Sequence, residues 1–173
     1  EPAFDTYAPV IAMAGSNRVT VSLVPDGRGF ALDVDALRAA LTPRTRAMIV
    51  NSPHNPTGMV LSERDLRALA GFAVEADLLV ISDEVYEHLV YDGRQHLPLA
   101  TYPGMAERTV TISSAAKMFN CTGWKIGWAC GAPELIAGVR AAKQYLSYVA
   151  GAPFQPAVAY ALNHEDAWVG QLR

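Results

Sequence analysis

Six polar side chains in this sequence are of types that could carry out chemistry together. Lys117 follows a β-like run and lies between small residues, so a bulky group has room beside its amine. A lysine amine that has lost its proton can attack an aldehyde and form a Schiff base. The other candidates are Asn55, Asp83, Tyr86, Ser114 and Lys125.

These residue types match the needs of one kind of cofactor, an aldehyde with a ring nitrogen, a phenolic oxygen and a phosphate. The carboxylate of Asp83 would keep the ring nitrogen protonated, which turns the ring into an electron sink. The amide of Asn55 and the phenol of Tyr86 would donate hydrogen bonds to the ring oxygen. Ser114 and the cationic Lys125 would bind the phosphate. The residues therefore predict a covalent cofactor site.

The elements that must position these side chains alternate between strands and helices. The strands predicted from apolar runs span residues 46–51, 78–81 and 108–112. Such alternation is typical of an α/β fold whose sheet is buried on both faces. Ligands of these sheets bind beyond the carboxyl ends of the strands, where Asn55, Asp83 and the Ser114–Lys117 turn fall. We therefore expect one site at one edge of one sheet.

The remaining elements are predicted from periodicity and from capping residues. Asp33 and Ser62 stand where they can cap helices, and Pro133 stands in the first turn of another. The expected helices span 7–14, 34–41, 62–76, 133–147 and the chain from about 156, and the further strands span 19–24 and 125–130. Cys130 is expected to be a small buried residue of the last strand.

Composition limits the class of protein. The chain has 173 residues, 51% hydrophobic and 18% charged, with a formal net charge of −3. This is enough chain for one sizeable core, and it offers no basic field for nucleic acid or an anionic membrane. No apolar stretch is long enough to span a membrane, and two cysteines are too few for a disulfide framework. A cytoplasmic protein is the simplest interpretation.

The two ends predict an internal piece of a larger protein. The chain starts at Glu1 without a methionine or a signal-peptide pattern, and it stops at Arg173 within a helical pattern.

Four motifs resemble, in order and spacing, those of the class I and II aminotransferases of fold type I, which depend on pyridoxal 5′-phosphate. They are Asn55-Pro56-Thr57-Gly58, Asp83-Glu84-Val85-Tyr86, Ser114-Ala115-Ala116-Lys117 and Gly123-Trp124-Lys125-Ile126-Gly127-Trp128. The stretch from Ser114 to Trp128 is similar to the kynurenine aminotransferase and cysteine-conjugate β-lyase branch. That branch includes N-succinyldiaminopimelate aminotransferases of lysine biosynthesis.

The resemblance implies a three-layer α/β large domain with a mostly parallel sheet. Residues 1–173 would be its central part, and an amino-terminal segment and a smaller C-terminal domain would lie outside the chain. A homodimer is implied, because a neighbouring subunit contributes to the site in this fold. The implied substrates are an amino-acid donor, often glutamate, and a keto acid.

The resemblance also implies a role for each candidate residue. Lys117 would bind the cofactor covalently and carry the substrate proton, and Asp83 would pair with the pyridine nitrogen. Asn55 and Tyr86 would hold the 3′ oxygen. Ser114 and Lys125 would contact the phosphate. Many relatives have arginine at the position of Lys125, so we expect the phosphate affinity to differ.

Several alternatives stay open at this stage. The same cofactor would also serve β-elimination from a cysteine conjugate or transamination of kynurenine, and a similar domain serves as a cofactor sensor in some transcription regulators. Asn55 and Asp83 could instead be turn and capping residues, and Lys125 a surface lysine. Trp124 and Trp128 are better explained by packing. The histidines lack metal-ligand spacing, so no metal is expected.

Overall fold

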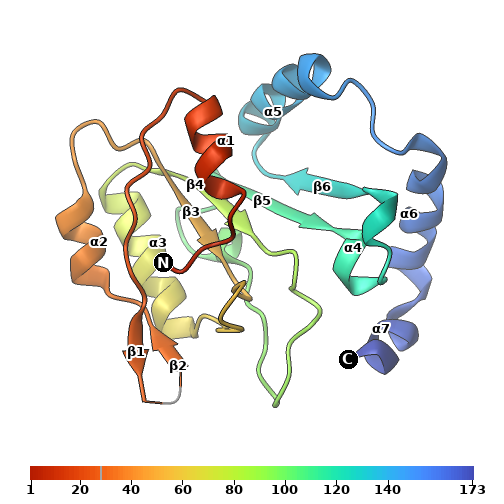
Figure 1. Ribbon diagram of the computed structural model, residues 1–173, viewed down its shortest axis with the longest axis horizontal. Helices are drawn as coiled ribbons and strands as arrows, with labels where there is room; N and C mark the ends of the chain where they lie inside the picture. Colours follow the sequence, from red (N-terminus) through yellow and green to blue (C-terminus); the bar gives the residue numbers. More distant parts are fainter. Residues whose placement is uncertain (28) are drawn as a thin grey trace.

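The computed structural model describes residues 1–27 and 29–173, which form a mixed α/β arrangement (Figure 1). The helices are α1 (Tyr7–Met13), α2 (Val34–Ala40), α3 (Glu63–Glu75), α4 (Ala115–Met118), α5 (Pro133–Leu146), α6 (Gln155–His164) and α7 (Asp166–Leu172). The strands are β1 (Val24–Asp26), β2 (Gly29–Ala31), β3 (Ala47–Asn51), β4 (Leu79–Asp83), β5 (Thr109–Ser114) and β6 (Gly127–Cys130). Short 3₁₀ helices are η1 (Leu99–Thr101), η2 (Thr122–Trp124) and η3 (Ala152–Phe154).

The larger sheet has the strand order β3-β4-β5-β6, with β3, β4 and β5 parallel and β6 antiparallel to β5. The predicted α/β class with a mostly parallel sheet is therefore confirmed. Asn51 is paired in register with Asp83, and Asp83 with Ile112. Because parallel strands end at the same edge, these three residues lie in one row at that edge.

Helix α3 anchors one face of this sheet. Ser62 and Asp65 form a capping box, in which the Ser62 hydroxyl accepts from the Asp65 N–H and the Asp65 carboxylate accepts from the Ser62 N–H. The buried side of α3 presents Leu66, Leu69 and Ala73, which pack in one core with Val50 and Val80. Fully burying a leucine or valine side chain contributes about 1.5–3 kcal/mol. The helix therefore holds β3 and β4 in place.

The other face of the sheet is more open than the sequence predicts. Along β4, Val80 and Ser82 are 1% and 2% exposed, whereas Leu79 and Ile81 are 46% and 36% exposed. Burial thus alternates with the strand period of two residues. An apolar run without polar interruptions predicts burial on both faces, and within the described part of residues 1–173 only the face of Val80 and Ser82 is covered.

The predicted strand 19–24 is also wrong, because the ladder begins only at Val24, where β1 pairs with β2. Residues 19–23 make single backbone contacts instead. The Leu23 N–H donates to the Glu1 carbonyl at 2.8 Å, and the Glu1 amine donates to the Val21 carbonyl. Alternation along the sequence indicates an extended chain, but it does not supply a partner strand.

Two smaller predictions need correction. Cys130, the last residue of β6, is exposed and not buried among the residues that the structure describes. The single helix expected from about residue 156 is divided into α6 and α7, with the break at Glu165, whose φ of −112° departs from helical values.

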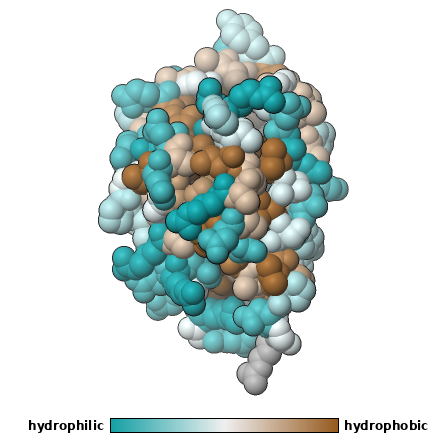
Figure 2. All heavy atoms as spheres, turned by 90° about the vertical axis from the view of Figure 1, so that its left-hand side faces the viewer, coloured by the Kyte–Doolittle hydropathy of each residue, from teal (hydrophilic) through white to brown (hydrophobic). Residues whose placement is uncertain are grey.

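The surface around α2 and the β1–β2 pair mixes hydrophilic and hydrophobic side chains (Figure 2). Val24, Phe30 and Leu41 are among the exposed apolar residues. Among the residues that the structure describes, no helix has the length and apolar character needed to cross a membrane.

Candidate active site

The carboxyl edge of the parallel strands carries a cavity of about 310 Å³. The loop after β3, the end of β4 and the β5–α4 junction all contribute to it, together with the start of α1. The lining residues are Phe4, Tyr7, Asn51, Asn55, Asp83, Val85, Tyr86, Ile112, Ser113, Ser114 and Lys117. Five of the six residues predicted from the sequence therefore meet at one place.

Asp83 is the last residue of β4, and two donors fix its carboxylate. The Tyr7 hydroxyl donates to Oδ2 at 2.5 Å, and the Val85 backbone N–H donates to Oδ1 at 3.2 Å. Burial, with the hydrogen bond to Asp83 and its charge, raises the pKa of Tyr7 far above its ordinary value. The phenol therefore stays protonated and keeps donating, so the carboxylate is oriented before any ligand binds.

Asn55 is held in position by a residue that the sequence analysis did not select. Asn51 ends β3, and its Nδ2 donates to the Asp83 carbonyl at 2.9 Å. Its Oδ1 accepts from the Asn55 N–H at 2.9 Å. One amide thus ties the loop after β3 to the end of β4 and brings Asn55 to the cavity.

The loop that carries Asn55 has further support from His54 and Thr57. The Nδ1 atom of His54 lies 2.7 Å from the Thr57 hydroxyl, which also accepts from the Met59 N–H at 3.2 Å. Burial lowers the pKa of His54 below its ordinary value, so the ring favours the neutral form. His54 itself is not among the residues that line the cavity in the described chain.

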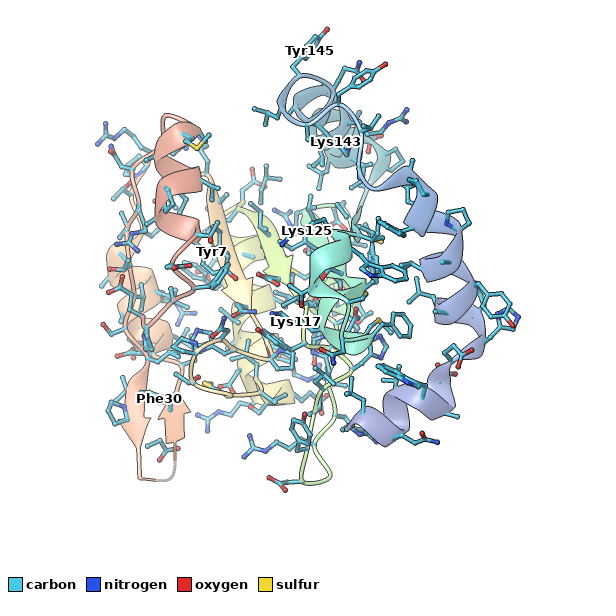
Figure 3. All side chains as sticks on the ribbon, turned by 45° about the vertical axis from the view of Figure 1, so that its right-hand side comes forward. Tyr7, Phe30, Lys117, Lys125, Lys143 and Tyr145 are labelled. Atoms are coloured by element: carbon cyan, nitrogen blue, oxygen red, sulfur yellow. The ribbon has the colours of Figure 1, made fainter. Side chains whose placement is uncertain are left out.

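Lys117 lies on the short helix α4, where the sequence had predicted a turn. Its Nζ atom is 5.7 Å from the centre of the Tyr86 ring, so the amine and this aromatic ring share one wall. Ser114 precedes the helix, and its Oγ accepts from the Ala116 N–H at 3.3 Å. Figure 3 labels Tyr7 on α1 and Lys117 on α4, two residues from distant parts of the chain that line the same cavity.

Lys125 is the sixth predicted residue, and it is not among the lining residues in the part of the chain described. It follows η2 in the left-handed region, with φ 57° and ψ 42°. This conformation is uncommon for a residue with a side chain. Its phosphate contact stays a prediction. Trp124 contacts Phe154 at 4.6 Å between ring centres, and Trp128 packs against the cluster of Ala115, Ile126 and Val158.

The donors and acceptors of the cavity fit a cofactor of the expected chemistry. An amine, a preoriented carboxylate and a phenol stand around a space whose walls also include Phe4 and Ile112. Such a site offers an anion for a protonated ring nitrogen, a nucleophile for an aldehyde and apolar groups for the faces of a ring. Phe4, Tyr7, Asn51 and Ser113 are the polar and aromatic residues of this cavity that sequence reasoning missed.

Comparisons with known proteins agree with this geometry. The family model of class I and II aminotransferases matches residues 1–173. The chain is 76% identical over its whole length to a probable N-succinyldiaminopimelate aminotransferase, DapC, of Mycobacterium tuberculosis, and it covers 44% of that protein. It is 41% identical to mouse kynurenine–oxoglutarate transaminase 1, with 99% of this chain and 42% of the relative covered.

Solved structures give the same picture. The structure of N-succinyldiaminopimelate aminotransferase from Mycobacterium tuberculosis superposes with a TM-score of 0.99 at 76% identity, over all of this chain and 45% of the other. Aspartate aminotransferase from Thermus thermophilus with maleate superposes at 0.91 and 38% identity, over 99% and 44%. The chain thus spans less than half the length of the relatives that it matches. On its sequence and its fold, this chain belongs to the class I and II aminotransferase family.

Proposed function

We propose that the protein containing this chain is a pyridoxal 5′-phosphate-dependent aminotransferase, and that residues 1–173 are the central part of its cofactor-binding domain. The observation that carries the proposal is that Lys117 and Asp83 line one cavity. This cofactor requires an amine that reacts with its aldehyde and a carboxylate that pairs with its protonated ring nitrogen. When bound, the cofactor supplies an electron sink for the electrons released at the substrate Cα atom.

Each of the six residues predicted from the sequence has a task in this proposal. Lys117 would bind the cofactor aldehyde, and it would then take a proton from the substrate Cα atom and deliver it to the C4′ atom of the cofactor. Asp83 keeps the proton on the ring nitrogen. Asn55 and Tyr86 donate to the ring oxygen. Ser114, with Lys125, binds the phosphate.

The proposed amino acceptor or donor is of the N-succinyldiaminopimelate class, in lysine biosynthesis. Support comes from the 76% identity to the Mycobacterium tuberculosis protein, against 41% to the mouse kynurenine transaminase. A core pocket that relatives share does not select the substrate, so residues beyond this chain are expected to do so. We further propose a homodimer in the cytoplasm.

The test is chemical trapping in the full-length protein. The protein is mixed with pyridoxal 5′-phosphate, reduced with borohydride and digested, and the modified peptide is identified by mass spectrometry. The adduct is expected on Lys117. Lys117→Arg should abolish it, whereas Lys143→Arg, a change at an exposed position of α5, should leave it unchanged.

A panel of substrates completes the test. Glutamate with the keto acid of the N-succinyldiaminopimelate pair should give 2-oxoglutarate. Pyruvate and ammonia from a cysteine conjugate would instead indicate β-elimination. An adduct confined to other lysines, or no adduct at all, would contradict the proposal.

A further inference from the structure

A buried carboxylate lies directly beside the site and has no task in the proposed chemistry. Glu84 follows Asp83 at the end of β4, and it is only 1% exposed. Burying a carboxylate is costly unless donors surround it. Its surroundings therefore have to supply those donors.

Three donors serve the Glu84 carboxylate. The Ser82 hydroxyl donates to Oε1 at 2.7 Å, and the Leu99 N–H approaches the same oxygen at 3.4 Å. His96 Nε2 lies 2.7 Å from Oε2, with the His96 side chain 8% exposed. Glu84, Glu87 and His96 each have a possible metal-ligand atom within 4.8 Å of the others. However, His96 Nε2 and Glu84 Oε2 are already hydrogen-bonded to each other.

His96 shows that this contact has a cost. Its Nδ1 atom is buried and has no hydrogen-bond partner among the residues that the structure describes. With the proton on Nε2, the imidazole donates to Glu84 and leaves Nδ1 as an acceptor without a donor. Buried groups without partners are rare in folded proteins and call for an explanation. This cost is offset if the Glu84–His96 contact fixes the chain between the two residues.

The chain between Glu84 and His96 carries the site residues that follow β4. The Val85 N–H donates to Asp83 Oδ1, and the Tyr86 ring stands beside Lys117 Nζ. Farther along, Glu87 accepts from the Ser113 hydroxyl at 2.6 Å, and Ser113 also lines the cavity. Glu84 fixes the start of this segment through its bond to Ser82 of β4, and His96 fixes the end of the segment through its bond to Glu84.

We propose that Glu84 and His96 form a positioning pair that holds Val85 and Tyr86 in the geometry needed for cofactor binding and turnover. The inference rests on the proposed function, because it assigns the pair to the same cavity. Neither residue touches the cofactor in this proposal. Both act through the backbone donor to Asp83 and through the Tyr86 phenol.

The experiment uses the full-length protein with Glu84→Gln, His96→Asn and Ser82→Ala. Ser82→Ala removes one donor with little change of volume, so it is the variant least prone to misfolding. Glu75→Gln and His164→Asn are the matched controls, since both side chains are exposed. The measurements are the Kd of pyridoxal 5′-phosphate for the cofactor-free protein, the absorbance maximum of the bound cofactor, and kcat and KM.

The proposal predicts a loss of function in protein that remains folded. The kcat of Glu84→Gln and His96→Asn should fall about tenfold to a hundredfold, since small misplacements of positioned groups have effects of this size. KM should change much less, the cofactor should bind more weakly, and its absorbance maximum should shift. His96→Gln, whose amide can donate from nearly the same place as Nε2, should recover most of the loss.

The double variant supplies a further criterion. If the two residues act as a unit, Glu84→Gln with His96→Asn should be hardly worse than the worse single variant. Additive losses would contradict the pair. Unchanged Kd, absorbance and kcat in folded Ser82→Ala and His96→Asn, with only the unfolding midpoint lowered, would overturn the proposal and leave a purely structural role.

The failure of this inference can be distinguished from the failure of the proposed function. If the unsubstituted protein gave no adduct at Lys117, the proposed function would be wrong and the positioning role would fall with it. If the unsubstituted protein formed the adduct while the variants matched it in every measurement, only the positioning role would be wrong.

Discussion

Replacing Tyr7 by phenylalanine tests the preorientation of Asp83 most directly. The change removes one oxygen atom and keeps the ring, whose edge-to-face contact with Phe4 has its centres 5.7 Å apart. The Asp83 carboxylate would lose its shorter hydrogen bond, 2.5 Å to Tyr7, and keep the longer one, 3.2 Å to the Val85 N–H. The side chain would then rotate more freely.

The size of the effect follows from these two bonds. A hydrogen bond to a charged group contributes about 1.5–3 kcal/mol, and the half-buried position of Tyr7 favours the lower end. We therefore expect the free energy of unfolding of the cofactor-free protein to fall by about 1.5 kcal/mol. Ordering a freed side chain when the cofactor binds costs about 0.5–1.5 kcal/mol. The Kd of pyridoxal 5′-phosphate should therefore rise about twofold to tenfold.

The assay is a titration of the cofactor-free, full-length protein with pyridoxal 5′-phosphate, followed by absorbance, alongside urea denaturation. Tyr91→Phe is the control, because Tyr91 is exposed and is not one of the lining residues in the described chain. It should match the unsubstituted protein in both measurements. Wild-type affinity and wild-type stability in Tyr7→Phe would refute the reasoning, since the 2.5 Å contact would then do nothing for the carboxylate.

Three further outcomes are expected. Asp83→Asn keeps the shape of the side chain but removes its charge, so kcat should fall by about 10²-fold or more in steady-state assays, and a variant with normal kcat would remove Asp83 from the mechanism. Ser62→Ala breaks the capping box of α3 and should lower the free energy of unfolding by about 1 kcal/mol in urea denaturation, with cofactor affinity unchanged. The pKa of Tyr7 is raised in the folded state, so as the pH rises the phenol of the unfolded chain loses its proton first, near pH 10. The stability that Tyr7 contributes is therefore complete below that pH and is lost as the pH rises above it. In urea denaturation, the free energy of unfolding should fall less steeply with pH in Tyr7→Phe than in the unsubstituted protein.

The main elements of the fold could be predicted because their signals are local. Ser62 and Asp65, only three positions apart, indicate the start of α3. The apolar runs of β3, β4 and β5 can be recognised without any tertiary information. Asp83 and Lys117 could be selected because they follow such runs, and parallel strands end together. Their meeting in one cavity follows from that rule.

The parts that could not be predicted depend on distant contacts. Tyr7 reaches Asp83 across 76 positions, and nothing in its own neighbourhood of small apolar residues marks it as a site residue. Val19–Val24 has the alternation of a strand, but a strand also needs a neighbour, which only Val24 finds. Leu79 and Ile81 are as apolar as buried residues, and the sequence does not say which face another element covers.

Asn51 shows how narrowly one position can be specified. Its amide must donate on one side, to the carbonyl of Asp83, and accept on the other, from the N–H of Asn55. Aspartate could only accept, and leucine could do neither. A search pattern for this pocket gains discrimination if it requires asparagine four positions before Asn55, and an engineer who redesigns the loop should leave that amide untouched.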